Sequence, residues 1–136
     1  MDFSVDHTVT EDDIVVMVVS GPMDVATTPR LRNLLVRVID DGHHRLVLDV
    51  SGVDFIDSIG LGVIVGMVHR LRPHDGSLAI AAPTEQTRAI FQITQLVRVI
   101  ALHDTTDSAV NAVRNGEAIV SGTRSSRRPA DSDAAP

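Results

Sequence analysis

Residues 48–62 read Leu48-Asp49-Val50-Ser51-Gly52-Val53-Asp54-Phe55-Ile56-Asp57-Ser58-Ile59-Gly60-Leu61-Gly62, and this stretch decides how the chain folds. It begins in an apolar strand, passes through a short polar loop and enters a helix at Ser58. A hydroxyl at that point can cap the helix, or it can accept a phosphate and change what the surface binds. The predicted function depends on which of these two roles Ser58 has.

Hydrophobic and turn patterns on both sides of this stretch predict strands that alternate with helices. The predicted strands cover residues 3–9, 14–19, 46–50, 78–82 and 97–102. The predicted helices run from Thr28 as N-cap to Gly42, from Ser58 to about residue 72, from Thr84 to about residue 95, and from Thr105 or Thr106 to Gly116. The β-branched run at 14–19 suits a strand that is covered on both faces.

The resulting order, ββαβαβαβα, is typical of an α/β domain with a mixed, mostly parallel sheet of about five strands and about four helices. The first two strands are expected to form an antiparallel hairpin. A length of 136 residues fits one domain, which we place at residues 1–120. Residues 121–136 carry no apolar type larger than Ala, so a disordered C-terminal tail is predicted there.

Composition argues against several classes of function. The formal charge is −6 and the chain has neither Trp nor Tyr, so its composition argues against binding to nucleic acid. The acidic N-terminus does not resemble a signal peptide, and the longest apolar stretch, 59–68, is too short to span a bilayer. We therefore expect a cytoplasmic protein with no membrane partner. The chain has no Cys, the adjacent pair His43-His44 should point in different directions, and His69 and His74 show no ligand spacing, so no metal is expected. Without a Gly-x-Gly-x-x-Gly or Walker loop, no cofactor is expected either.

The helix that begins at Ser58 has more features than a cap requires. Gly60, Gly62 and Gly66 each cost about 1 kcal/mol relative to Ala, and the last two share one face. Such a strip lets another backbone approach closely, or it packs on the sheet. Val63 and Met67 fall outside the core stripe, which we place at Leu61, Ile64, Val65, Val68 and Leu71. These two side chains are expected either to form a binding surface or to lie under a second helix.

The stretch from Val47 to Gly62 resembles the signature of STAS domains, and within them it is most similar to bacterial anti-sigma factor antagonists. The shared pattern is an apolar strand that ends in Asp, a Ser-Gly-Val loop, and then Phe-Ile-Asp-Ser-x-Gly-Leu-Gly. The turn Gly21-x-x-Asp24 also resembles the family, although Pro22 stands where Glu is frequent. The resemblance covers about residues 3–118.

The resemblance implies a phosphorylation switch in transcription regulation and stress response. The unphosphorylated protein would bind an anti-sigma factor with serine kinase activity and so free a sigma factor. That kinase would phosphorylate Ser58 and release the protein, and a PP2C-type phosphatase would restore it. Asp57 would orient the hydroxyl and contact the partner. The predicted partner-binding residues are Asp57, Asp24, Ile59, Gly60, Gly62, Val63, Gly66 and Met67. The expected state is a monomer or a weak homodimer, with no catalytic activity of its own.

Two alternatives remain open. The domain could be a STAS scaffold or interaction module in another signalling complex. It could also be a small α/β hydrolase with Ser58 or Asp57 as nucleophile. The sequence favours the hydrolase less, because Ile56 stands where a nucleophile elbow of the Gly-x-Ser-x-Gly type has its first Gly.

Overall fold

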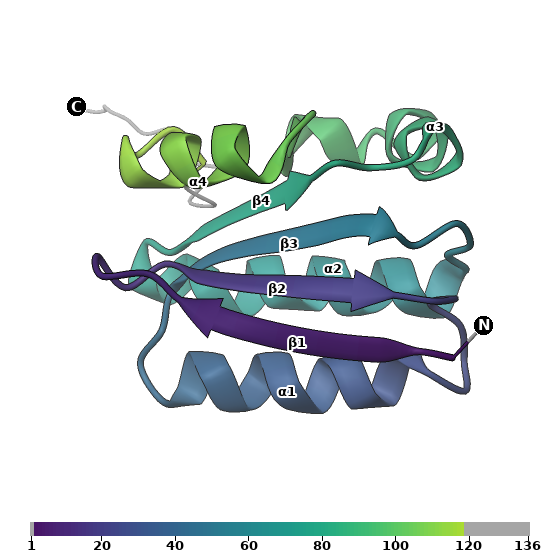
Figure 1. The fold of residues 1–136 in the computed structure, drawn as a ribbon, viewed down its shortest axis with the longest axis horizontal. Coiled ribbons are helices and arrows are strands. Elements are labelled where there is room, and N and C mark those ends of the chain that lie inside the picture. The colour runs from purple at the N-terminus through teal and green to yellow at the C-terminus, as the bar shows by residue number, and fades with distance from the viewer. Residues whose placement is uncertain (1, 119–136) are drawn as a thin grey trace.

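A computed structural model describes residues 2–118, which form one five-stranded mixed sheet flanked by helices (Figure 1). The strands are β1 (Ser4–Val9), β2 (Val15–Ser20), β3 (Arg45–Gly52), β4 (Ser77–Ala81) and β5 (Ala101–His103), and they lie side by side in this order. The helices are α1 (Thr28–Asp40), α2 (Ser58–Leu71), α3 (Glu85–Ile93) and α4 (Thr106–Arg114), with 3-10 turns η1 (Arg72–His74) and η2 (Leu96–Arg98). The hairpin β1–β2 is antiparallel and all other neighbours are parallel, so the predicted order ββαβαβαβα is confirmed.

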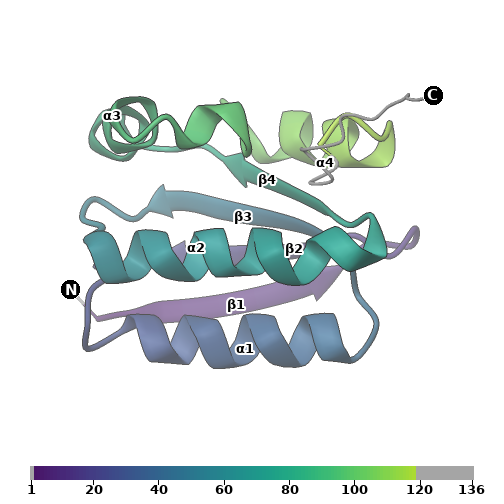
Figure 2. The same cartoon turned by 180° about the vertical axis from the view of Figure 1, so that it is seen from behind.

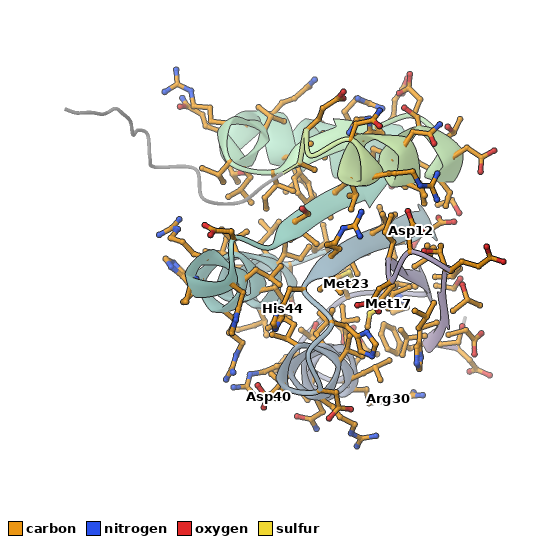
Figure 3. All side chains as sticks on the ribbon, turned by 90° about the vertical axis from the view of Figure 1, so that its left-hand side faces the viewer. Asp12, Met17, Met23, Arg30, Asp40 and His44 are labelled. Carbon is orange, nitrogen blue, oxygen red and sulfur yellow. The ribbon has the colours of Figure 1, made fainter. Side chains whose placement is uncertain are left out.

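The larger core lies between the sheet and the helix pair α1–α2, which run side by side across one face (Figure 2). Apolar residues at helical spacing on α1, among them Leu31, Leu35 and Val38, point into this core. Met17 of β2 and Met23, just after β2, are fully buried in it (Figure 3). Burial of this aliphatic surface is the main source of stability for a chain with so few aromatic side chains.

The smaller core lies on the opposite face, where α4 packs on β3 and β4. Small side chains at Ala79, Ala81 and Ala109 allow the helix to approach the sheet closely. Helix α4 does not cover all of β2 on this face, because Val18 is 41% exposed there. The prediction that the strand at 14–19 is covered on both faces is therefore wrong for its second half.

Several element boundaries differ from the sequence prediction by one or two residues, and the start of the last strand differs by four. Helix α1 includes Thr28, whose buried side chain lies inside the helix, and Thr27 occupies the N-cap position instead. Strand β5 begins at Ala101, because residues 96–98 form the turn η2 rather than extended chain. The predicted C-cap is confirmed: Gly42 has φ +103° after α1, where a side chain would be strained.

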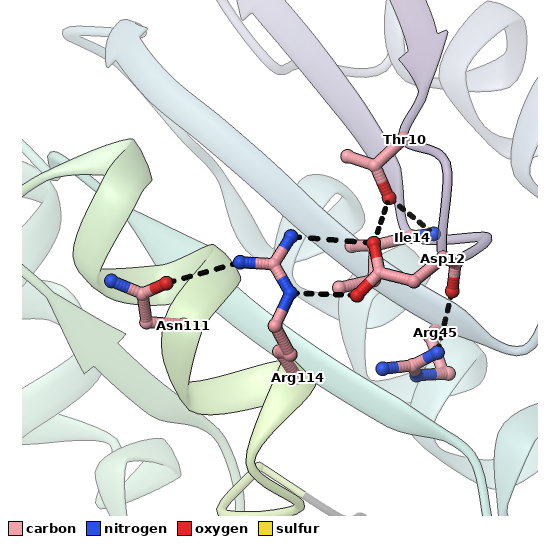
Figure 4. A network of polar contacts seen from close by, with 6 residues as sticks. All are labelled: Thr10, Asp12, Ile14, Arg45, Asn111 and Arg114. Carbon is pink, nitrogen blue, oxygen red and sulfur yellow. Dashed lines mark hydrogen bonds and ion pairs between the residues drawn. The ribbon is translucent and has the colours of Figure 1, made fainter.

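A polar clamp joins α4 to the β1–β2 turn (Figure 4). Arg114 Nε lies 2.6 Å from Asp12 Oδ2, and Arg114 Nη2 lies 3.3 Å from Asp12 Oδ1. Thr10 Oγ1 donates to the same carboxylate at 2.7 Å, and Arg45 Nη1 donates to the Asp12 carbonyl at 2.6 Å. The hydrogen bonds from Arg114 and Thr10 hold the pKa of the Asp12 carboxyl well below its usual range, and the carboxylate raises the pKa of Arg114.

No helix among residues 2–118 is both long and apolar enough to cross a membrane. The predicted tail at residues 121–136, and the last two residues of the predicted domain, lie outside the described part of the chain.

Candidate functional site

The turn between β3 and α2 displays Ser58 on the surface at the carboxyl end of the central strand. Val53 and Ile56 anchor the turn by burial, while Asp54 and Phe55 between them are exposed. The Val53 carbonyl accepts a hydrogen bond from Thr87 Oγ1 at 3.1 Å, which ties the turn to the start of α3. The turn is therefore held by its two buried residues and by the bond to α3, and this gives Ser58 a defined position at its end.

Asp57, not Ser58, caps α2. Its Oδ1 accepts hydrogen bonds from the backbone N–H groups of Ile59 at 2.9 Å and Gly60 at 3.0 Å, and its backbone is extended, as an N-cap requires. The sequence left open a capping role for the Ser58 hydroxyl, and the structure gives that role to the preceding residue. Both residue types are good caps, and the backbone conformation of residue 57 decides between them.

The Ser58 hydroxyl is consequently free of a structural role. Ser58 is the first residue of α2 and is exposed, and within residues 2–118 its hydroxyl takes part in no hydrogen bond. A group attached to that oxygen would project into solvent without displacing the two bonds that Asp57 makes to the helix N-terminus.

A second loop lies against this turn. The backbone N–H of Met23 donates to the Phe55 carbonyl at 2.9 Å, and the N–H of Asp57 donates to the Met23 carbonyl at 3.1 Å. Asp24 follows directly in this loop, so the structure brings Asp24 and Asp57 to the same end of the sheet as Ser58. Asp24 Oδ1 accepts from the N–H groups of Ala26 and Thr27, which shapes the turn into α1.

The three glycines of α2 have two different environments. A Cβ at Gly60 would lie 2.9 Å from Ile56 Cγ1 and 3.0 Å from the Met23 carbonyl oxygen, so Gly60 is required by packing. A Cβ at Gly62 or Gly66 would meet nothing within 4 Å. Of the two explanations that the sequence left open for this pair, packing on the sheet is wrong, and both glycines face open space.

Two residues predicted for the binding surface lie elsewhere. Met67 is only 2% exposed and belongs to the larger core, so its prediction as a surface contact is wrong. Val63 is half-buried and packs against the same core. The buried side of α2 confirms Ile64, Val68 and Leu71 of the predicted stripe, and it has Gly60 and Met67 in place of Leu61 and Val65.

Sequence reasoning missed two exposed apolar residues beside Ser58. Val25, in the loop before α1, is 69% exposed, and Phe55 is 52% exposed. Ile59, which the sequence did include, is 48% exposed. Phe55 belongs to the segment of residues 48–62, but the sequence alone does not distinguish a solvent-exposed Phe from a buried one.

The remaining candidates have structural roles. His43 pairs with Asp13 at 2.7 Å, and His44 stacks on His74 with ring centroids 3.8 Å apart. Across residues 2–118 no three His, Cys, Asp or Glu side chains are grouped so that they could hold a metal ion. Asp104 accepts a hydrogen bond from Arg88 at 2.7 Å.

Fold and site together define a small α/β domain whose functional turn lies on an exposed surface at the carboxyl edge of its sheet. Residues 7–109 match the STAS domain family, and the chain belongs to that family. The Staphylococcus epidermidis anti-sigma-B factor antagonist is 33% identical over 101 residues, which are 74% of this chain and 94% of that protein. The Staphylococcus aureus anti-sigma-B factor antagonist is 30% identical over the same share of each chain.

Solved structures agree with this assignment. The crystal structure of an anti-sigma factor antagonist from Mycobacterium paratuberculosis has a TM-score of 0.76 and 30% identity, and the match covers 83% of this chain and 95% of that one. SpoIIAA in its unphosphorylated form has a TM-score of 0.67 at 21% identity, over 82% of this chain and 98% of its own, and shows that the fold is shared. Homologues of this chain at about 30% identity over most of its length thus include anti-sigma factor antagonists.

Proposed function

We propose that this protein is a cytoplasmic anti-sigma factor antagonist that is switched by phosphorylation at Ser58. The unphosphorylated form binds an anti-sigma factor with serine kinase activity, and the bound sigma factor is released. Phosphorylation by that kinase ends the interaction, and a PP2C-type phosphatase restores it. The protein acts in this cycle by binding, as a monomer or a weak homodimer, and it catalyses no step.

One observation carries the proposal: Ser58 is exposed at the start of α2 while Asp57 makes the capping bonds. A kinase can reach the hydroxyl, and esterification leaves the helix cap in place. The phosphate adds about 1.5 to 2 negative charges at neutral pH, beside the carboxylates of Asp54 and Asp57. A partner surface that covers Ser58 closely would then have to desolvate a dianion, which weakens the complex.

The partner surface in this proposal surrounds Ser58. It includes Asp57 and Ile59 at the carboxyl edge of the sheet, and the open face of α2 at Gly62 and Gly66, while Asp24 shapes the neighbouring loop from within. Gly60 supports it from beneath, since packing against Ile56 and Met23 fixes the first turn of α2. The bare helix face allows the partner's backbone to approach closely.

A hydrolase built on this turn has less support. A serine nucleophile needs a base within hydrogen-bond reach, and within residues 2–118 no histidine bonds to the Ser58 hydroxyl. The nearest carboxylate, Asp57, is committed through Oδ1 to the helix N-terminus. A scaffold role in another signalling complex would use the same surface with a different partner.

The test is a phosphorylation assay with the host's serine-kinase anti-sigma factors and ATP, read by mass spectrometry. We expect one phosphate on Ser58 and none on the Ser58→Ala variant. Ser51→Ala is the matched control, because Ser51 is an exposed serine of the same segment and should not affect the reaction. In pull-down experiments Ser58→Ala should bind the kinase with or without ATP, and Ser58→Glu should bind poorly. Phosphate on another residue, with Ser58→Ala still modified, would refute the proposal.

A further inference from the structure

Three large apolar side chains are exposed around Ser58. Val25 is 69% exposed, Phe55 52% and Ile59 48%, and they come from the loop before α1, the β3–α2 turn and the first turn of α2. We call these three residues the apolar triad. Side chains of this kind add little to folding while they face water, and exposed apolar residues that gather at one end of a sheet are typical of a protein interface.

The triad stands on a rigid support. The two loops that carry Val25 and Phe55 are joined by the parallel bridge between Met23 and Ile56 and by the hydrogen bonds on either side of it. Met23 and Ile56 are themselves buried in the larger core. The two loops are therefore held in one backbone arrangement, and a partner need not order them when it binds.

The Asp24 carboxylate holds the loop that presents Val25. Asp24 Oδ1 accepts hydrogen bonds from the Ala26 N–H at 2.9 Å and from the Thr27 N–H at 3.0 Å. The Thr27 hydroxyl donates to the Pro22 carbonyl at 2.5 Å and accepts from the Asp24 N–H at 3.1 Å. These bonds close a tight turn that has Val25 on its outside. Oδ2 of Asp24 makes no hydrogen bond among the described residues.

We infer that the apolar triad selects the anti-sigma factor, and that Asp24 is a positioning residue that holds Val25 in place. The inference rests on the proposed function and names the chemistry of its partner: a protein surface with an apolar pocket for Val25 and Phe55. The flanking carboxylates of Asp54 and Asp57 complement basic groups at the rim of that pocket. Phosphorylation affects binding through the triad because it places negative charge on Ser58, which lies directly beside Ile59 and three residues from Phe55 in the sequence.

The first test compares binding of single variants to the kinase anti-sigma factor by titration calorimetry. Val25→Ser and Phe55→Ser should each bind at least about tenfold more weakly than the wild type, as expected for apolar contacts near the centre of an interface. Their thermal midpoints should stay unchanged, because both side chains are exposed. Ile93→Ser is the matched control: Ile93 is 81% exposed at the end of α3 and should bind within about twofold of wild type.

The second test separates positioning from direct charge contact at Asp24. Asp24→Asn keeps Oδ1 as an acceptor and should bind within about twofold of wild type, whereas Asp24→Ala loses the turn and should bind at least about fivefold more weakly. Amide NMR spectra check that both variants are folded. Equal weakening by Asn and Ala would overturn the positioning role, because the charge itself would then matter. Wild-type affinity for Val25→Ser and Phe55→Ser would overturn the role of the triad.

A different result would refute the proposed function itself. If the wild-type protein binds none of the serine-kinase anti-sigma factors, the function is wrong and this inference falls with it. If the wild type binds and is phosphorylated on Ser58 but the variants behave as wild type, only the inference is wrong.

Discussion

Asp57 accepts a hydrogen bond from the backbone N–H of Gly60 at 3.0 Å, and this contact decides between the two roles that the sequence left open for Ser58. The Asp57 carboxylate caps the helix and the neighbouring Ser58 hydroxyl remains free. The stability of the helix start therefore depends on Asp57, and Ser58 can be replaced without loss of the cap.

Removing the cap should destabilise the protein. We expect Asp57→Ala to lower the free energy of unfolding by about 1 kcal/mol, because the N–H groups of Ile59 and Gly60 lose their acceptor. Asp57→Asn keeps an acceptor oxygen and should lower the free energy of unfolding by only a few tenths of about 1 kcal/mol. Urea denaturation followed by circular dichroism measures both. Ser58→Ala should leave the stability unchanged, and a loss as large as that of Asp57→Ala would mean that the serine caps the helix after all.

The open glycines of α2 should show opposite effects on stability and binding. Gly62→Ala and Gly66→Ala place a methyl group in open space, so each should stabilise the protein by about 0.5 to 1 kcal/mol through helix propensity. The same methyl groups should weaken binding to the anti-sigma factor, because they keep the partner's backbone away from the helix. Denaturation and calorimetry on the same samples give the two quantities.

Gly60→Ala provides the contrast within the same helix. Its Cβ would lie 2.9 Å from Ile56 Cγ1 and 3.0 Å from the Met23 carbonyl oxygen, so the substitution should destabilise the protein despite the better helix propensity. If all three alanine variants were stabilised alike, the close packing at Gly60 would be wrong. If Gly62→Ala and Gly66→Ala bound as tightly as wild type, the open face would lie outside the interface.

Met67 should behave as a core residue. It is 2% exposed and packs in the cluster under α1 and α2, so we expect Met67→Ala to cost about 2 to 5 kcal/mol. Met67→Leu conserves volume and should cost less than about 1.5 kcal/mol. A Met67→Ala variant with wild-type stability and weakened binding would instead restore the surface role that the sequence suggested.

Most of the fold could be predicted from the sequence because its signals are local and agree with one another. The β-branched runs, the Leu and Val spacing of α1 and the Gly42 stop each indicate one element, and their alternation leaves few topologies. The error on α2 has a physical cause. Apolar residues surround that helix, so the pattern fits two overlapping stripes that share Ile64, Val68 and Leu71, and packing in the folded domain decides between them.

The site was predicted in part. The motif correctly brought Ser58, Asp57 and Asp24 to one end of the sheet, because strand ends and the loops that follow them meet there. The exposure of Val25 and Phe55 could not be predicted, since it depends on how two loops far apart in the sequence bond to each other. The clamp between Asp12 and Arg114 was also missed, because 102 residues separate its partners.

That clamp predicts a specific response to acid. The hydrogen bonds from Arg114 and Thr10 lower the pKa of Asp12 in the folded protein, so this carboxylate stabilises the fold above its unfolded pKa of about 3.9. The contribution declines as the pH falls below about 4, because the unfolded chain then binds a proton that folded Asp12 resists. Arg114→Ala should therefore be less stable than wild type at pH 7, and the difference should shrink steadily below pH 4. Urea denaturation at pH 7, 5 and 3 measures it.

Arg70→Ala is the control for this effect. Arg70 Nη1 lies 4.0 Å from Asp40 Oδ1 on the exposed surface, a geometry that contributes little to stability, so this variant should match the wild type at every pH. Because Asp12 and Arg114 are both accessible to solvent, about 0.5 M salt should reduce the Arg114→Ala difference at pH 7. A difference of equal size at pH 7 and pH 3 would show that Arg114 acts through packing of its side-chain stem rather than through the Asp12 carboxylate.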